Sequence, residues 1–151
     1  MLSPPCSHSA RPPMHSVMPE QAPTFAPDAA LIECLARAAL ARIPEPFQTH
    51  LADVVLLVEE FADEETLDAL GIDDPFALSG LYHGRPIGEK SAFDSGGLPD
   101  RIHLYRRAIL DEWVETGESL ERLVQHVVVH EVGHHFGLSD GDMHALEDAA
   151  G

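Results

Sequence analysis

The chain has 151 residues, of which 44% are hydrophobic, enough for one globular domain with a core. Its 26 acidic and 9 basic residues give a net charge of −17 at pH 7. Such a surface repels the phosphates of nucleic acids and of anionic membranes, so we expect neither as a partner.

Residues 1–27 are predicted to be a disordered tail. This segment holds seven of the chain's 12 prolines and few large apolar residues, so it cannot offset the entropy of ordering. It also lacks the apolar segment of a secretory signal, and no run in the chain nears the roughly 18 apolar residues of a membrane span. The two cysteines, Cys6 and Cys34, suggest no disulfide framework, which favours a reducing compartment. We therefore expect a cytoplasmic protein.

The folded domain is predicted to span residues 28–151. Asp28 is a suitable N-cap for a first helix that ends before Pro44, and Asp63 caps a second helix that Gly71 ends. Helices are expected over 28–43 and 63–70. A third helix is expected to follow the last strand and to run through Trp113 until Gly117 breaks it, and a fourth is expected over about 118–136. Strands are expected over 54–61, 76–84 and 101–106, and a loop over 85–99. The predicted class is α+β, with about three strands in one small sheet packed against helices.

Two periodic patterns share the segment "HVVVHEVGHHFGLSD", which runs from His126 to Asp140. Apolar side chains recur every four residues at Leu120, Val124, Val128 and Val132. Histidines recur every four residues at His126, His130 and His134, on a face about 200° away. These periods predict a helix with one apolar side and one histidine stripe.

A metal site follows from the spacing of five residues. His130 and His134 are one helical turn apart, and two imidazoles about 5–6 Å from each other can share one Zn²⁺. Glu131 lies beside them and is suited to act as the general base that takes a proton from an attacking water. Gly137 can end the helix and turn the chain back, so that Asp140 becomes the third ligand. Zn²⁺ is the expected ion, although these ligand types also accept other divalent ions.

Several neighbouring side chains have other possible roles. Asp142, His144 and Glu147 compete with Asp140 as the third ligand. His126 lies one turn before His130 and is expected at the surface. His135, four residues after Glu131, either orients that carboxylate or is a packing residue.

The stretch from His130 to Asp140 fits HExxHxxGxxD, the extended motif of zincin metallopeptidases. The chain from about Asp28 to Asp142 resembles a small bacterial family of zincin-like metallopeptidases, the minimal zincins, in "PEPFQTHLADVVLLVEEF", "LSGLYHGRPI", "LPDRIHLYRRAIL" and "VVVHEVGHHFGLSD". The resemblance implies a compact zincin fold, Glu131 as base, zinc on His130, His134 and Asp140, and hydrolysis of a peptide or protein substrate. The chain departs from longer relatives in leaving no room for a downstream Met-turn, so Met143 is predicted to be a packing residue.

Two further features bear on catalysis. The candidates to stabilise an oxyanion are Tyr82, His103, Tyr105 and Arg106. The segment "ALSGLYHG" is the expected sheet edge to which an extended peptide can add.

The alternative function is a catalytically silent zincin-fold protein with a metal-binding or regulatory role, which the small size favours. Glu131 favours the enzyme, because a purely structural zinc needs no base.

Overall fold

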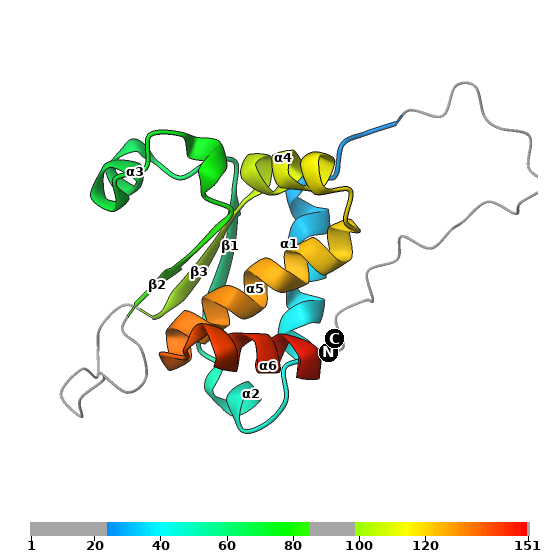
Figure 1. The fold of residues 1–151 in the computed structure, drawn as a ribbon, viewed down its shortest axis with the longest axis vertical. Coiled ribbons are helices and arrows are strands. Elements are labelled where there is room, and N and C mark those ends of the chain that lie inside the picture. The colour runs from blue at the N-terminus through cyan, green and yellow to red at the C-terminus, as the bar shows by residue number, and fades with distance from the viewer. Residues whose placement is uncertain (1–23, 85–98, 151) are drawn as a thin grey trace, which may run out of the picture.

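The computed structural model describes residues 24–84 and 99–150 (Figure 1). This part of the chain contains six α-helices, one short 3₁₀ helix and a three-stranded sheet, which confirms the predicted α+β class. The elements are α1 (Ala29–Ala41), α2 (Phe47–His50), β1 (Val55–Glu59), α3 (Glu64–Leu70), η1 (Pro75–Ala77), β2 (Gly80–His83), β3 (Arg101–Tyr105), α4 (Arg106–Thr116), α5 (Leu120–Phe136) and α6 (Asp140–Ala150). The predicted tail and the predicted loop lie almost wholly outside the described residues and stay predictions.

Local signals set the helix ends where they were expected. The Asp28 carboxylate accepts a hydrogen bond of 2.9 Å from the N–H of Leu31, and Asp63 caps α3 in the same way. Gly71 and Gly137 end α3 and α5 with φ of 68° and 65°, a left-handed conformation that glycine adopts without a steric cost.

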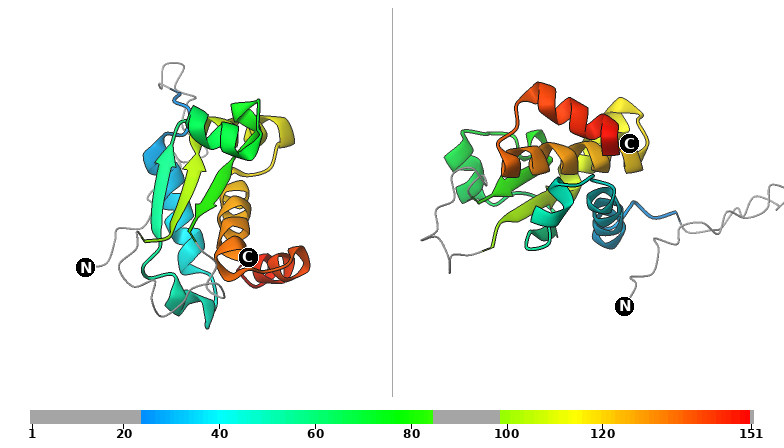
Figure 2. Two further views of the ribbon diagram at one scale, coloured as in Figure 1. Left: turned by 90° about the vertical axis from the view of Figure 1, so that its left-hand side faces the viewer. Right: turned by 90° about the horizontal axis from the view of Figure 1, so that it is seen from below.

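The sheet has the order β1-β3-β2, with β1 parallel and β2 antiparallel to β3. Leu56, Ile102 and Leu104 point from one face into the main core, and α1 and α5 cover that face (Figure 2, left, where both helices lie behind the sheet). Among the described strands β2 is at an edge, as predicted. It is shorter than predicted because Asp74 caps the 3₁₀ turn that precedes it.

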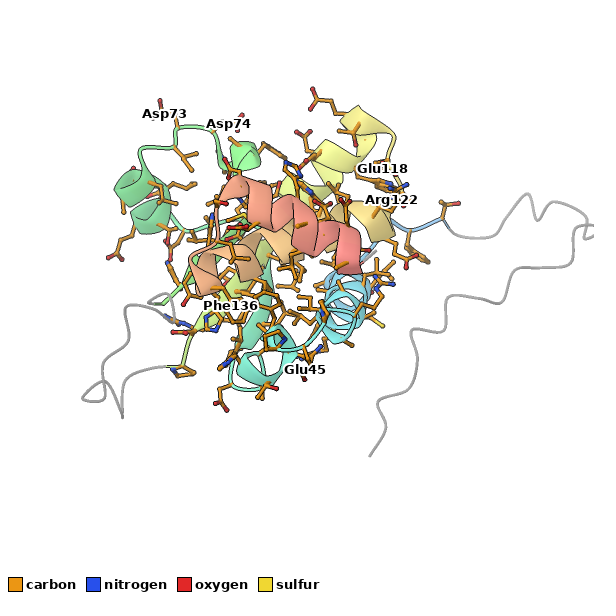
Figure 3. All side chains as sticks on the ribbon, turned by 60° about the horizontal axis from the view of Figure 1, so that its bottom comes forward. Glu45, Asp73, Asp74, Glu118, Arg122 and Phe136 are labelled. Atoms are coloured by element: carbon orange, nitrogen blue, oxygen red, sulfur yellow. The ribbon has the colours of Figure 1, made fainter. Side chains whose placement is uncertain are left out.

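Helix α5 is more deeply buried than the one-sided apolar pattern predicted. Its buried residues are Leu123, Val124, Val127, Val128, Val129, Glu131, Val132, Gly133 and His135. There are two reasons: α6 crosses α5 on a side that was expected to face solvent (Figures 1 and 3), and β2 covers Glu131. A Cβ on Gly133 would lie 2.6 Å from Cγ of Met143, so the glycine permits this close approach, and Met143 is the packing residue predicted.

The C-terminal end of α5 rests on the short helix α2. Phe136, labelled in Figure 3, packs edge-on against Phe47 with ring centroids 4.9 Å apart. This contact fixes the end of α5 just before the turn at Gly137, so the segment from His130 onward is held by packing on both sides.

One finding bears on the expected location of the protein. Within the described residues, no helix combines the length and the apolar character that crossing a bilayer requires. Cys34 lies on α1 and Cys6 lies outside the described residues, so the expectation of a reducing compartment stays a prediction. The cytoplasmic location stays a prediction.

Candidate metal centre

The last two turns of α5 bring together His130, Glu131 and His134. One potential ligand atom from each lies within 4.8 Å of the others, and the two imidazole centroids are 4.7 Å apart. The His130 ring is half-buried, whereas the His134 side chain retains 46% of its exposure. The two imidazoles suit Zn²⁺ as ligands, and the exposed His134 leaves the group open to solvent on one side.

Glu131 has a different environment from the two histidines, because only 5% of it is exposed. Its Oε2 accepts a hydrogen bond of 2.8 Å from the main-chain N–H of Tyr82 and lies 3.3 Å from Nδ1 of His134. Burial raises the pKa of Glu131, while His130 and the Tyr82 N–H act in the opposite direction. A buried carboxyl group with a raised pKa binds a proton more readily than one in water, which is what a general base requires.

Asp140 is the first residue of α6 and is exposed. Among the described residues, the compact histidine–glutamate group does not include it. Asp140 and His130 line the same cavity of about 270 Å³ between α5 and α6. The chain reversal at Gly137 therefore returns Asp140 to the neighbourhood of His130, as predicted, but α6 begins there in place of a short irregular return.

The competing ligands lie in the same region with other partners. Asp142 accepts a hydrogen bond of 2.8 Å from the Ser139 hydroxyl at the start of α6. Glu147 lies 2.9 Å from Nδ1 of His126, one turn before His130. His144 lines the same cavity as Asp140. Of these acids, Asp140 alone has no side-chain partner recorded in the described part of the chain.

His135 was expected either to orient Glu131 or to pack. Only 2% of it is exposed, and its Nδ1 lies 3.1 Å from the Tyr82 hydroxyl and 3.1 Å from Oδ2 of Asp100. Its recorded contacts therefore hold Tyr82, the residue whose N–H binds Glu131. The roles of Tyr82 and Asp100 were not predicted. Tyr82 binds Glu131 through its main chain across 49 residues, and Asp100 is 35 residues from His135, so neither contact leaves a local signal in the sequence.

The four candidate oxyanion donors separate in space. Arg106 binds the Glu60 carboxylate at 3.0 Å, and His103 lies 2.6 Å from Glu59 on the opposite face of the sheet. Tyr105 is 2% exposed and belongs to a small second core under α3. Tyr82 is the candidate with a recorded contact to Glu131, and that contact uses its main chain.

The fold and the site together define a class of protein: an α+β domain with a histidine–glutamate–histidine group on a central helix, suited to a metal ion. The zincin-like metallopeptidase family matches residues 51–150, about two thirds of the chain. The chain belongs to the zincin-like metallopeptidase family. The match begins after α1 and α2, although α1 supplies Ile32, Ala36 and Ala39 to the main core. A comparison with curated proteins gives no match.

Proposed function

We propose that the protein is a zinc-dependent metallopeptidase in which His130, His134 and Asp140 hold Zn²⁺ and Glu131 is the general base. The main support is the compact group of His130, Glu131 and His134, whose potential ligand atoms lie within 4.8 Å of one another. When bound at these residues, zinc would supply Lewis-acid chemistry, polarising a carbonyl and acidifying a water.

Glu131 carries the proton transfer in this proposal. Its carboxylate takes a proton from the attacking water and passes it to the leaving amine. The Tyr82 N–H, at 2.8 Å from Oε2, holds the carboxylate at the edge of β2, and burial raises its pKa. Gly80 and Val127 lie beside the Glu131 side chain and exclude bulk water from one side of the base.

The position of the edge strand β2 supports a peptide as the substrate. The β2–β3 register pairs Tyr82 with Ile102, and the N–H of Tyr82 reaches Glu131 and not β3. The outer edge of β2 therefore runs past the proposed base. An extended peptide that adds to this edge by main-chain hydrogen bonds would bring a peptide bond close to Glu131.

The test compares the full chain with Glu131→Gln in two assays. One measures zinc by mass spectrometry, and the other measures cleavage of a mixed library of unstructured peptides. We expect Glu131→Gln to keep its zinc and to lose at least about 100-fold in cleavage rate. The matched control is Glu121→Gln, an exposed glutamate on the same helix, and we expect it to leave the rate unchanged.

The alternative is a catalytically silent protein with a metal-binding or regulatory role. The small size of the domain favours this second candidate, because it leaves little wall for a deep substrate cleft. If zinc binds and depends on His130 and His134, but the wild type cleaves no peptide in the library, the peptidase proposal is lost and the silent alternative stands.

A further inference from the structure

A second histidine pair lies on the face of the sheet that points away from α5. Because side chains alternate along a strand, the burial of Ile102 and Leu104 in the main core places His103 on the opposite face. The β2–β3 register puts Leu81 opposite His103, and His83 follows two residues later on the same face. Figure 2, left, looks onto this face, with α3 at the upper end of the strands.

The two nitrogens of His103 have unequal surroundings. Its Nδ1 lies 2.6 Å from Oε1 of Glu59, and the side chain is 11% exposed. Its Nε2 is buried and has no hydrogen-bond partner among the described residues. With Nδ1–H donating to the carboxylate, the neutral imidazole keeps its lone pair on Nε2. Histidines that bind metals commonly have this arrangement, with a carboxylate on one nitrogen and the ion on the other.

His83 completes the pair. The rings of His83 and His103 have centroids 5.0 Å apart and planes inclined by 74°. Two imidazoles on one tetrahedral ion, with metal–nitrogen bonds of about 2.0–2.1 Å, have centroids about 5 Å apart. The pair His130 and His134 on α5 has nearly the same geometry, with 4.7 Å and 66°.

The charges around the pair favour a cation. Both histidines line a cavity of about 550 Å³ together with the carboxylates of Glu59, Asp63 and Glu65 and with one opposing charge, Arg101. Burial lowers the pKa of His83, and the positive charge of Arg101 lowers it further. A neutral imidazole is the form that binds a metal, so His83 is available at neutral pH.

We propose that His83 and His103 form a second site for a divalent transition metal, on the opposite face of the sheet from the histidine group of α5. Imidazole pairs select Zn²⁺, Ni²⁺ or Cu²⁺ over Mg²⁺ or Ca²⁺. No carboxylate among the described residues forms with His83 and His103 a group as compact as the one on α5, so water would complete the coordination of the ion. The ion would join the end of the edge strand β2 to β3, one residue beyond Tyr82.

The experiment uses the full chain with His130→Ala and His134→Ala, so that the α5 group does not contribute. His8→Gln and His15→Gln are added to remove the histidines near the N-terminus. We expect calorimetric titration with Zn²⁺ to give one ion per chain. His83→Gln in this background should weaken binding at least tenfold, whereas His50→Gln, an exposed histidine on α2, should leave it unchanged.

His83 is half-buried, so its substitution leaves the core intact, and circular dichroism checks the fold. In a second measurement, nitrogen NMR of the imidazoles should show Nε2 of His103 shifting on addition of Zn²⁺. The proposal is overturned if this background binds no Zn²⁺ at micromolar concentration, or if His83→Gln and His50→Gln bind it equally. Neither outcome bears on the peptidase proposal, because the α5 group is absent from the variants.

Discussion

The main-chain N–H of Tyr82 donates a 2.8 Å hydrogen bond to the carboxylate of Glu131. This bond joins the edge strand β2 to the central helix α5 at the proposed base. It lowers the pKa of a carboxyl group that burial raises, so the position of β2 affects both the location and the proton affinity of Glu131.

Gly80 allows β2 to approach α5 closely enough for that bond. A Cβ at this position would lie 2.7 Å from Cγ1 of Val127 and 3.2 Å from Cγ of Glu131. We expect Gly80→Ala to lower the free energy of unfolding by about 1–3 kcal/mol through overpacking, and to reduce kcat/KM by displacing Glu131. Urea denaturation and peptide cleavage measure the two effects.

The control for this prediction is Gly141→Ala in α6. The nearest atom to a Cβ there is the Ser139 hydroxyl at 4.0 Å, so no clash arises. Because alanine favours helix over glycine, we expect this variant to gain up to about 1 kcal/mol. Equal stability of the two alanine variants would show that the close approach of Gly80 does not matter.

The Tyr82 hydroxyl has a separate structural role, since it lies 3.1 Å from Nδ1 of His135. Tyr82→Phe removes that contact and keeps the main-chain N–H on Glu131. We expect a loss of about 1 kcal/mol in the free energy of unfolding and an unchanged pH profile of cleavage. A shifted acid limb in that profile would contradict the separation of the two roles.

Asp140 and Asp142 offer a matched test of the third ligand. Loss of a residue that only supports a metal ligand commonly costs 10–100-fold in affinity. A direct ligand should matter more than such a supporting residue, so we expect Asp140→Asn to weaken Zn²⁺ binding by at least about 100-fold. The affinity is measured in a His83→Gln background, which removes the second site. Asp142, which accepts a hydrogen bond from Ser139, should tolerate replacement by Asn with its zinc affinity intact. The reverse order of affinities would assign the ligand to Asp142.

Tyr105, in the second core under α3, provides a prediction about the dependence of stability on pH. Burial, together with the charges of Glu59, Asp63 and Glu131, raises its pKa to about 12. Between pH 10 and about 12 the unfolded chain releases the tyrosine proton and the folded chain retains it, so stability falls as pH rises. Absorbance at high pH should show one tyrosine ionising near 12, and Tyr105→Phe should remove both that step and the associated loss of stability. Ionisation of Tyr105 near pH 10 in the folded chain would contradict this.

The parts of the fold that follow from short-range chemistry could be predicted from the sequence. Asp28 and Asp63 cap their helices because a carboxylate three residues before an N–H reaches it without help from the rest of the fold. Gly137 ends α5 because its left-handed conformation suits glycine. The proximity of His130, Glu131 and His134 also follows from short-range geometry, because their spacing places all three within about one turn of a single helix.

The rest depended on contacts between distant segments. Helix α6 was not among the predicted elements, because Met143 and Leu146 become buried only once the helix docks on α5. The histidine stripe gave no indication that Glu131 would be covered by β2. The pairing of His83 with His103 follows from the β2–β3 register, which joins strands that were predicted separately.

The most direct test of the central claim is a crystal of the full chain grown with Zn²⁺, with anomalous maps collected on both sides of the zinc edge. The proposed site predicts an anomalous peak in contact with His130, His134 and Asp140, which disappears in His130→Ala/His134→Ala. An ordered α5 with no peak at these residues, in crystals where zinc is detected elsewhere, would contradict the claim.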